Sequence, residues 1–220
     1  MTHAPPGSEP GLCKDPPVTE LPMFPLGSVL VPGAPLPLHV FEPRYRAMVE
    51  QVLDGDGRFG VVLIERGHEV GGGDVRMDVG TVAQILRGEQ LDDGRWLIVA
   101  IGTERIRVRE WLPDDPYPRA HVESWPDEDA VVPADLLADV AARLVRVHAL
   151  GSELGLPPVD VDLSPDPREA SHQAVAYAPI GPLDAWQLLT APHPRARLEQ
   201  LRDRLDDEID VRRQQLATEG

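Results

Sequence analysis

The spacing of hydrophobic residues separates a β-rich part of the chain from a helical part. Between residues 20 and 125, short apolar runs alternate with turn-forming residues, a pattern typical of β-strands. The runs cover residues 28–31, 37–40, 59–65, 81–86, 96–101, 104–111 and 120–125. Strands repeated at this spacing predict a β-barrel or a β-sandwich.

Turn-forming segments mark where we expect these strands to end. They are Pro32-Gly33, Gly71–Asp74, Asp92–Gly94 and Gly102-Thr103. Asp93-Gly94 gives the strongest hairpin signal, because glycine adopts a positive φ without steric cost. In the run at 104–111, apolar residues alternate with Arg105, Arg107 and Arg109. This alternation predicts a half-buried strand with its arginines facing solvent.

One helix is expected inside the β-rich part, directly after the corner Phe41-Glu42-Pro43-Arg44-Tyr45. Pro43 suits the first helical position, and glycines at 55 and 57 end the helix. One apolar stripe follows the helical period: Tyr45, Met48, Val49, Val52 and Leu53. We expect the Glu42 carboxylate to cap the helix, and Arg44 and Arg46 to pair with carboxylates such as Glu69. His39, on the strand before this corner, is expected to be partly exposed and not catalytic.

The pattern becomes helical after an acidic linker at 126–132. Helical spacing covers residues 136–147, 172–177 and 183–189, and a last helix starts at Pro194. Its apolar stripe is Leu198, Leu201, Leu205 and Ile209, which we expect to pack on its own domain and not on a second copy. We therefore divide the chain into a disordered leader (1–19), a β-rich domain (20–125) and a helical domain (126–218).

Composition and charge narrow the classes of partner. The 220 residues carry a formal net charge of -16, which disfavours nucleic acid and anionic lipid. No apolar stretch is long enough for a membrane helix, and the N-terminus does not resemble a signal peptide. Cys13 is the only cysteine, so no disulfide can form within the chain. These features predict a cytoplasmic protein.

The residues that common catalytic sites require are missing from the sequence. Lys14 is the only lysine, so a P-loop or a serine–lysine dyad has no lysine in the folded part. There is no G-x-S-x-G motif, and the seven histidines show no metal-binding spacing. We expect no catalytic residues, no metal and no cofactor.

A series of motifs, in order, resembles the N-terminal substrate-binding domain of the Lon protease family. The longest is LPMFPLGSVLVPGAPLPLHVFEPRYRAMVEQVL at 21–53, with its FEPRY corner. Shorter matches are FGVVLI at 59–64, GHEVGGG at 67–73, VGTVAQI at 79–85, the segment 93–108, and LLTAPHPRARLEQLRDRL near the end. The resemblance covers roughly residues 20–212 and is strongest to short bacterial proteins that consist of this domain alone.

This resemblance implies an α+β fold, with a PUA-like β-barrel followed by a helical bundle. It implies a non-catalytic module, because nothing in the sequence matches the ATPase or protease domains of the family. The expected partner is an unfolded or extended polypeptide, or a protein complex to which the chain docks as an adaptor. The candidate groove residues are Phe24, Leu38, Phe41, Arg44, Tyr45 and Trp96. The corner itself is expected to be mainly structural.

RNA binding is the alternative function, because PUA-like barrels elsewhere bind RNA. Its best support is the arginine face of residues 105, 107 and 109, and its main difficulty is the net charge of -16. The sequence does not indicate the oligomeric state.

Overall fold

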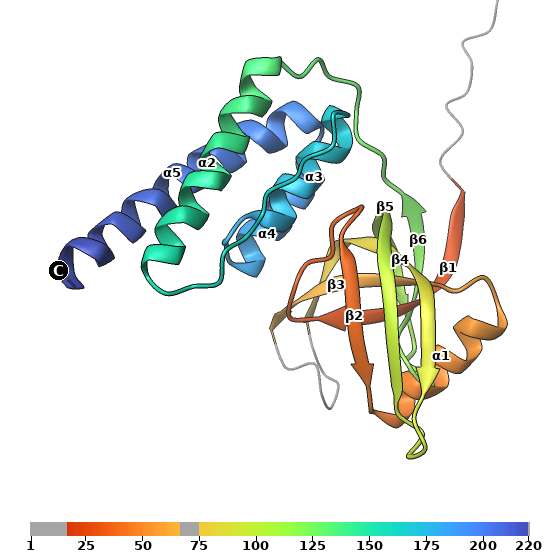
Figure 1. The fold of residues 1–220 in the computed structure, drawn as a ribbon. Helices are drawn as coiled ribbons and strands as arrows, with labels where there is room; N and C mark the ends of the chain where they lie inside the picture. The colour runs from red at the N-terminus through yellow and green to blue at the C-terminus, as the bar shows by residue number, and fades with distance from the viewer. Residues whose placement is uncertain (1–16, 67–74, 220) are drawn as a thin grey trace, which may run out of the picture.

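The computed structural model describes residues 17–66 and 75–219, which form a β-sheet and a group of helices joined by one linker (Figure 1). The strands are β1 (Val18–Leu26), β2 (Pro35–Val40), β3 (Arg58–Arg66), β4 (Val75–Gln90), β5 (Trp96–Leu112) and β6 (Arg119–Ser124). The helices are α1 (Pro43–Asp54), α2 (Ala134–Glu153), α3 (Pro167–Tyr177), α4 (Pro182–Leu189) and α5 (Pro194–Glu219). The predicted α+β class is confirmed. Residues 18–125 are called the sheet part below, and residues 134–219 the helical part.

The six strands form one mixed sheet in the order β2-β5-β4-β3-β1-β6. β1 pairs with β3 in parallel, and the other pairs are antiparallel. An additional pairing of β5 with β6 closes the sheet into a ring. Along one edge, β5 pairs with β4. Along its other edge, residues 96–101 of β5 pair with β2 and residues 106–112 pair with β6. Residues 102–105 of β5 therefore lie between the two partners on the second edge.

The structure differs from the expected strands at four points. Residues 28–31 form a loop, and the two runs at 96–101 and 104–111 belong to one strand, β5. Gly102 does not form a turn; it lies within β5, where an added Cβ would collide with the carbonyl oxygen of Val31. β1 was not predicted as a strand, and it begins at Val18, inside the expected leader.

The hairpin between β4 and β5 is confirmed. Gly94 has a φ of 80°, and its N–H donates to the Leu91 carbonyl at 2.8 Å. The Leu91 N–H donates to the Arg95 carbonyl at 2.8 Å, which closes the turn. The turn expected at 71–74 lies outside the described residues.

Helix α1 packs its predicted stripe on the sheet. Tyr45, Met48, Val49 and Val52 are buried, whereas Leu53 is 38% exposed and does not belong to the stripe. The Tyr45 ring stacks on Phe24 of β1 with 4.2 Å between the ring centroids. The corner before α1 therefore anchors the helix in the core of the sheet part.

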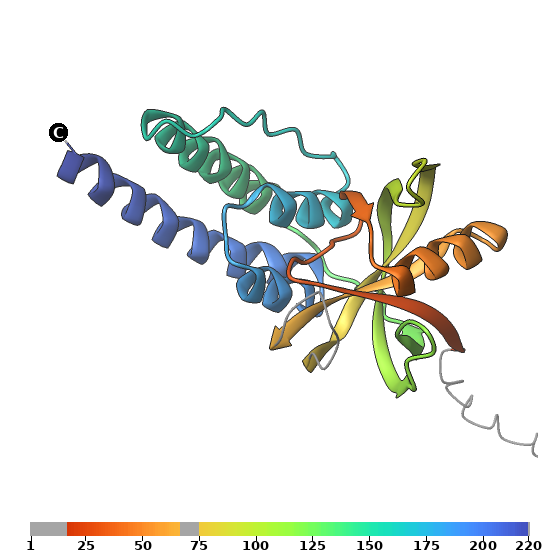
Figure 2. The same cartoon turned by 90° about the horizontal axis from the view of Figure 1, so that it is seen from below.

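The helical part has its own core, in which α5 packs along α2 (Figure 2). Leu198, Leu201, Leu205 and Ile209 of α5 are all buried against this core. The stripe thus packs within the chain, as expected. None of the helices in the described ranges is both long and apolar enough to cross a membrane.

Candidate functional site

At the corner before α1, the side chains of Glu42, Arg44 and Tyr45 contact one another, and the sequence did not predict these contacts. Glu42 occupies the N-cap position, but its carboxylate caps no backbone N–H. It accepts a hydrogen bond from Arg44 Nε at 3.1 Å, because a guanidinium offers a charged donor close by. The Arg44 guanidinium also lies over the Tyr45 ring, 4.5 Å from its centroid. The predicted cap is therefore wrong, and the proposed partner Glu69 lies outside the described residues.

The structure does not bring the six candidate groove residues together on one surface. Phe24 and Tyr45 are 8% and 3% exposed and belong to the core of the sheet part. Leu38 and Trp96 are half-buried and pack against the same core. Phe41 is 51% exposed, so its side chain is available to a ligand.

An apolar surface is present nearby, on the outward side of β2 and β5. Leu97 and Val99 of β5 are each 43% exposed and lie opposite His39 and Pro37 of β2. With Leu38 they line a shallow pocket of about 500 Å³. The surface formed by Pro37, Phe41, Leu97 and Val99 is called the outer apolar face below.

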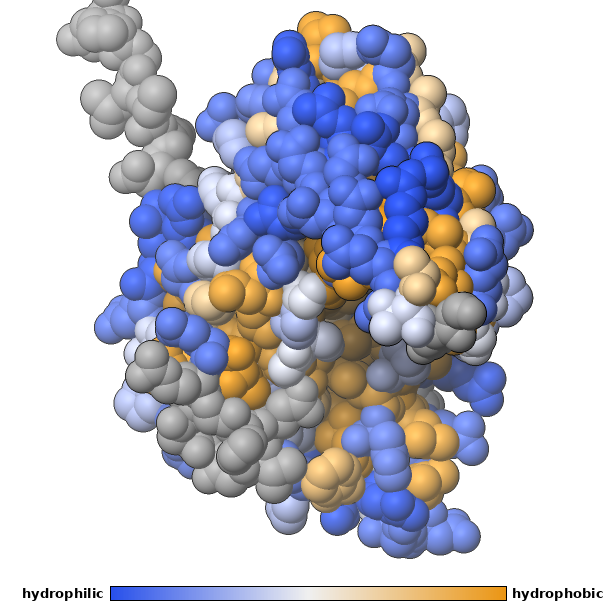
Figure 3. Space-filling model, turned by 90° about the vertical axis from the view of Figure 1, so that its left-hand side faces the viewer, coloured by the Kyte–Doolittle hydropathy of each residue, from blue (hydrophilic) through white to orange (hydrophobic). Residues whose placement is uncertain are grey.

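Phe41 extends this face beyond the end of β2. Its ring meets the His39 ring edge-on, with 6.3 Å between the centroids. On the other side, β4 borders the face with the exposed ion pair Arg87–Glu89 at 3.4 Å. Figure 3 shows that apolar residues are exposed over the sheet part, whereas polar residues cover most of the helical part in the same view. Exposed apolar surface rimmed by polar residues is typical of a site that binds another chain.

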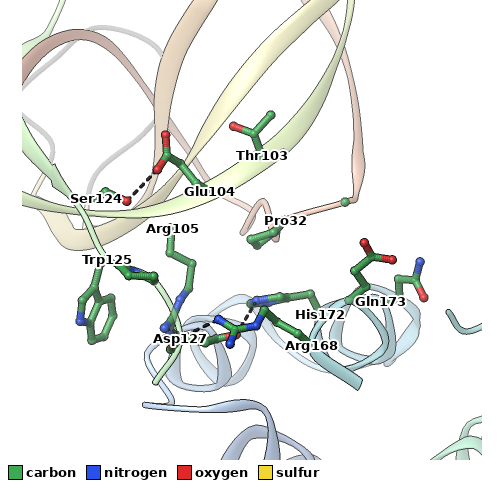
Figure 4. Close-up of a pocket in the computed structure, with 14 residues that line it drawn as sticks. Pro32, Thr103, Glu104, Arg105, Ser124, Trp125, Asp127, Arg168, His172 and Gln173 are labelled. Atoms are coloured by element: carbon green, nitrogen blue, oxygen red, sulfur yellow. Dashed lines mark hydrogen bonds and ion pairs between the residues drawn. The ribbon is translucent and has the colours of Figure 1, made fainter. Parts of the chain in front are cut away.

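A second feature is a buried group of charges where the sheet part, the linker and the helical part meet (Figure 4). Asp127 of the linker has a side chain that is 2% exposed. Its Oδ1 lies 2.6 Å from Nη2 of Arg105 in β5 and 2.6 Å from Nη2 of Arg197 in α5. Its Oδ2 lies 3.4 Å from Nε2 of His172 in α3. These four residues are called the junction cluster.

Further hydrogen bonds fix the two guanidiniums. Arg105 Nη1 donates to the carbonyls of Leu189 and Ala191 at 2.6 and 2.7 Å, at the end of α4. Arg197 Nη1 donates to Ser171 Oγ at 2.8 Å, and its Nε donates to the Leu188 carbonyl at 3.1 Å. Cations are favourable at a helix C-terminus, where free carbonyls point outward. Arg105 thus ties the sheet part to the helical part.

Burial and charge act together on the pKa values of the junction cluster. Burial alone would raise the pKa of the Asp127 carboxyl, but hydrogen bonds from His172 and Arg197, and the charges of both arginines, hold it well below its usual range. Burial lowers the pKa of His172 to about 4, although Asp127 opposes this shift. Burial also lowers the pKa of Arg105 to about 10. At neutral pH the cluster therefore contains two guanidiniums, one carboxylate and a neutral imidazole.

The arginine face predicted on β5 is only partly exposed: the Arg109 side chain is 52% exposed, whereas Arg105 is buried. Arg105 is 3% exposed and belongs to the junction cluster. Arg105 and Arg107 both lie over the Trp125 ring, at 4.5 and 4.2 Å, and Arg109 pairs with Glu123 at 2.6 Å. The best support for RNA binding is thereby weakened, because one of its three arginines is buried. The acidic linker is also not uniformly solvated, because Asp127 is buried.

A pocket of about 530 Å³, lined in part by the junction cluster, lies between residues 102–105 of β5 and helix α3. Thr103 and Glu104 line it from β5, and Arg168, His172 and Gln173 line it from α3. Its walls carry charges of both signs, so they indicate no single class of ligand. Within residues 17–66 and 75–219, no group of three or more His, Cys, Asp or Glu side chains is placed to hold a metal ion.

Comparison with known proteins assigns most of the chain to one family. The family model described as "ATP-dependent protease La (LON) substrate-binding domain" matches residues 20–207, which include most of the sheet part and of the helical part. The chain belongs to the LON substrate-binding domain family. The predicted resemblance is therefore confirmed.

Relatives of this LON domain are much longer than the chain. The Lon protease of Trichlorobacter lovleyi is 29% identical over 201 residues, which cover 87% of this chain and 24% of the relative. The Lon protease of Desulfovibrio desulfuricans is 31% identical over 200 residues, which cover 87% of this chain and 22% of the relative. The chain thus spans about a quarter of the length of these proteins.

Solved structures of LON domains share the fold. The crystal structure of a Lon N-terminal domain protein from Xanthomonas campestris is 29% identical and has a TM-score of 0.61, covering 83% of this chain and 96% of the other. The N-terminal domain of a Mycobacterium avium complex Lon protease is 18% identical, with a TM-score of 0.58 over 86% of this chain and 99% of the other. The latter likeness shows the fold alone.

Proposed function

We propose that this LON domain binds unfolded or extended polypeptide segments through the outer apolar face and catalyses no reaction itself. The observation that carries the proposal is the exposed pair Leu97 and Val99, which the sheet presents next to Pro37 and Leu38. Unfolded chains expose apolar side chains, and covering both surfaces removes them from water. The family supports a substrate-binding role. We place this activity in the cytoplasm, which suits a chain with a single cysteine.

The unpaired edge of β2 favours recognition of a polypeptide through its side chains and disfavours its addition to the sheet as a further strand. β2 pairs only with β5, so its other edge is the open end of the sheet. Proline has no N–H, so the N–H groups that bond β5 come from Leu36, Leu38 and Val40. The outward edge then has Pro35 and Pro37 at two of its three alternate positions. An added peptide strand would find few donors there.

The mode of recognition can be tested with two synthetic peptides of identical apolar side chains. One has an ordinary backbone, and in the other alternate amide nitrogens are N-methylated, which removes the donors a β-strand needs. We expect the two dissociation constants to agree within about threefold, because the outer apolar face makes no main-chain ladder. Fluorescence anisotropy of labelled peptides measures both constants. A loss of more than about tenfold, or 1.4 kcal/mol, on methylation would show that a strand is added instead.

A further inference from the structure

The junction cluster contains more positive than negative charge, and its side chains are almost fully buried. Arg105 and Arg197 share the single carboxylate of Asp127, and all three side chains are at most 2% exposed. One arginine belongs to the sheet part, the other to the helical part, and the carboxylate belongs to the linker between them. A buried arrangement of this kind depends on every partner, because an unpaired charge in the interior is costly.

His172 fits the closed junction cluster only when its imidazole is neutral. Its Nε2 faces Asp127 at 3.4 Å, so the single proton of the neutral imidazole belongs on that nitrogen. Among the described residues, its Nδ1 has no hydrogen-bond partner. Protonation would place a second N–H at Nδ1 with no acceptor, and a third positive charge beside two guanidiniums. The closed junction is therefore incompatible with the imidazolium.

The other charged groups around His172 do not remove this conflict. Arg168 and Glu169 flank it on α3, and Glu104 lines the same pocket from β5. Arg168 is a further cation that pairs with the exposed Asp129 at 3.1 Å. Glu104 is engaged by Arg58 at 2.7 Å and by Ser124 at 2.7 Å, and Glu169 accepts a hydrogen bond from Ser164 at 2.8 Å. None of these carboxylates neutralises the junction cluster.

We propose that the junction cluster is an acid-released latch, in which protonation of His172 separates the helical part from the sheet part while both parts stay folded. The two parts have largely separate cores, which supports opening between them. The junction also covers Val31 and Val79 of the sheet part, which belong to the same buried cluster as Leu188 and Leu189 of α4. Opening therefore uncovers apolar surface that the closed form hides.

The direction of the pH effect follows from where the proton binds more tightly. His172 has a pKa near 4 in the closed junction and an ordinary value near 6.5 once exposed. Stability of the closed form is fully present above pH 6.5 and is lost as the pH falls towards 4. Acidification from pH 8 to pH 5 shifts the equilibrium towards the open form by about 30-fold. Asp127 keeps its charge over this range because its pKa is lowered.

The test is a distance measurement between the two parts. Labels are attached at Asp92→Cys, in the exposed β4–β5 turn, and Gln215→Cys, on exposed α5, in a Cys13→Ser background. Fluorescence energy transfer is recorded from pH 8 to pH 4.5 together with far-UV circular dichroism. We expect the distance to increase between pH 6.5 and 4.5 while the dichroism stays constant.

Two controls connect the response to His172. The variant His172→Gln is expected to lose the distance change, whereas His39→Gln, at an exposed position of the sheet part, keeps it. If His172→Gln fails to fold, proton NMR of the wild type replaces it, and the His172 titration is expected to coincide with the distance change. A constant distance down to pH 4.5, simultaneous loss of helix and sheet signals, or a response that survives in His172→Gln would overturn the latch.

Discussion

Replacing Asp127 by alanine is expected to lower the free energy of unfolding by about 3–5 kcal/mol, the usual cost of removing one partner of a buried ion pair. Asp127 lies 2.6 Å from each of two buried guanidiniums, Arg105 and Arg197. Without its carboxylate both guanidiniums would remain buried in the junction with no counter-charge. Small domains are stable by only about 5–15 kcal/mol, so the loss is large. Urea unfolding at pH 7.5, followed by tryptophan fluorescence and circular dichroism, measures it.

The same linker provides a matched control. Asp129 is two residues away and pairs with Arg168 at 3.1 Å, but its side chain is fully exposed. Asp129→Ala is therefore expected to change the free energy of unfolding by less than about 1 kcal/mol. Equal losses for the two alanine variants would show that the junction cluster contributes no more than a surface pair.

Placing two aspartates on the outer apolar face is expected to weaken polypeptide binding at least tenfold. In the double variant Leu97→Asp/Val99→Asp, an apolar ligand would have to dehydrate two carboxylates, which opposes association. Both side chains are 43% exposed in the free protein, so the core stays intact. The fold should persist, although aspartate is a poor strand residue. Anisotropy titration of a labelled unfolded polypeptide gives the two dissociation constants.

An equivalent double substitution on the helical part tests whether weaker polypeptide binding comes from the outer apolar face itself or from the added negative charge. Val145 of α2 and Val211 of α5 are 58% and 47% exposed. The variant Val145→Asp/Val211→Asp adds the same charge and removes a similar apolar area. We expect it to bind within about twofold of the wild type. If both double variants bind equally poorly, the net charge of the chain, and not the outer apolar face, controls the interaction.

Helices and the β4–β5 hairpin could be predicted because their signals are local. The stripe from Leu198 to Ile209 and the glycine at position 94 specify buried faces and turns without reference to the rest of the fold. β1 was harder to predict, because Pro22 and Pro25 interrupt its apolar pattern. Gly102 imitates a turn, although it lies within β5, beside a register shift in the pairing with β4 and close to Val31. A sequence alone does not show which glycine lies beside another backbone.

The junction cluster could not be predicted for a similar reason. Alternation along β5 indicates that Arg105 and Ile106 face opposite sides. In the structure Ile106 belongs to a core cluster of the sheet part, whereas Arg105 pairs with Asp127 of the linker. Whether the side of β5 that carries Arg105 is exposed to solvent depends on how the helical part packs on it. This packing cannot be seen in the local sequence, because Arg197 of the helical part is ninety-two positions further along the chain. Asp127 stands in an acidic run that looks solvated, and only the packing of α3 and α5 buries it. Of the groove residues, Phe41 lies on the outer apolar face and Leu38 lines the pocket beside it. Leu97 and Val99 were not among the candidate residues.

The central claim is that this LON domain captures unfolded polypeptide through apolar contacts, and anisotropy of a labelled, permanently unfolded polypeptide tests it most directly. The wild-type protein is titrated at 50 and 300 mM salt, with an RNA oligomer as competitor. We predict saturable binding at tens of micromolar that salt leaves nearly unchanged and that RNA does not displace. No binding at these concentrations, or binding that salt abolishes and RNA displaces, would contradict the claim.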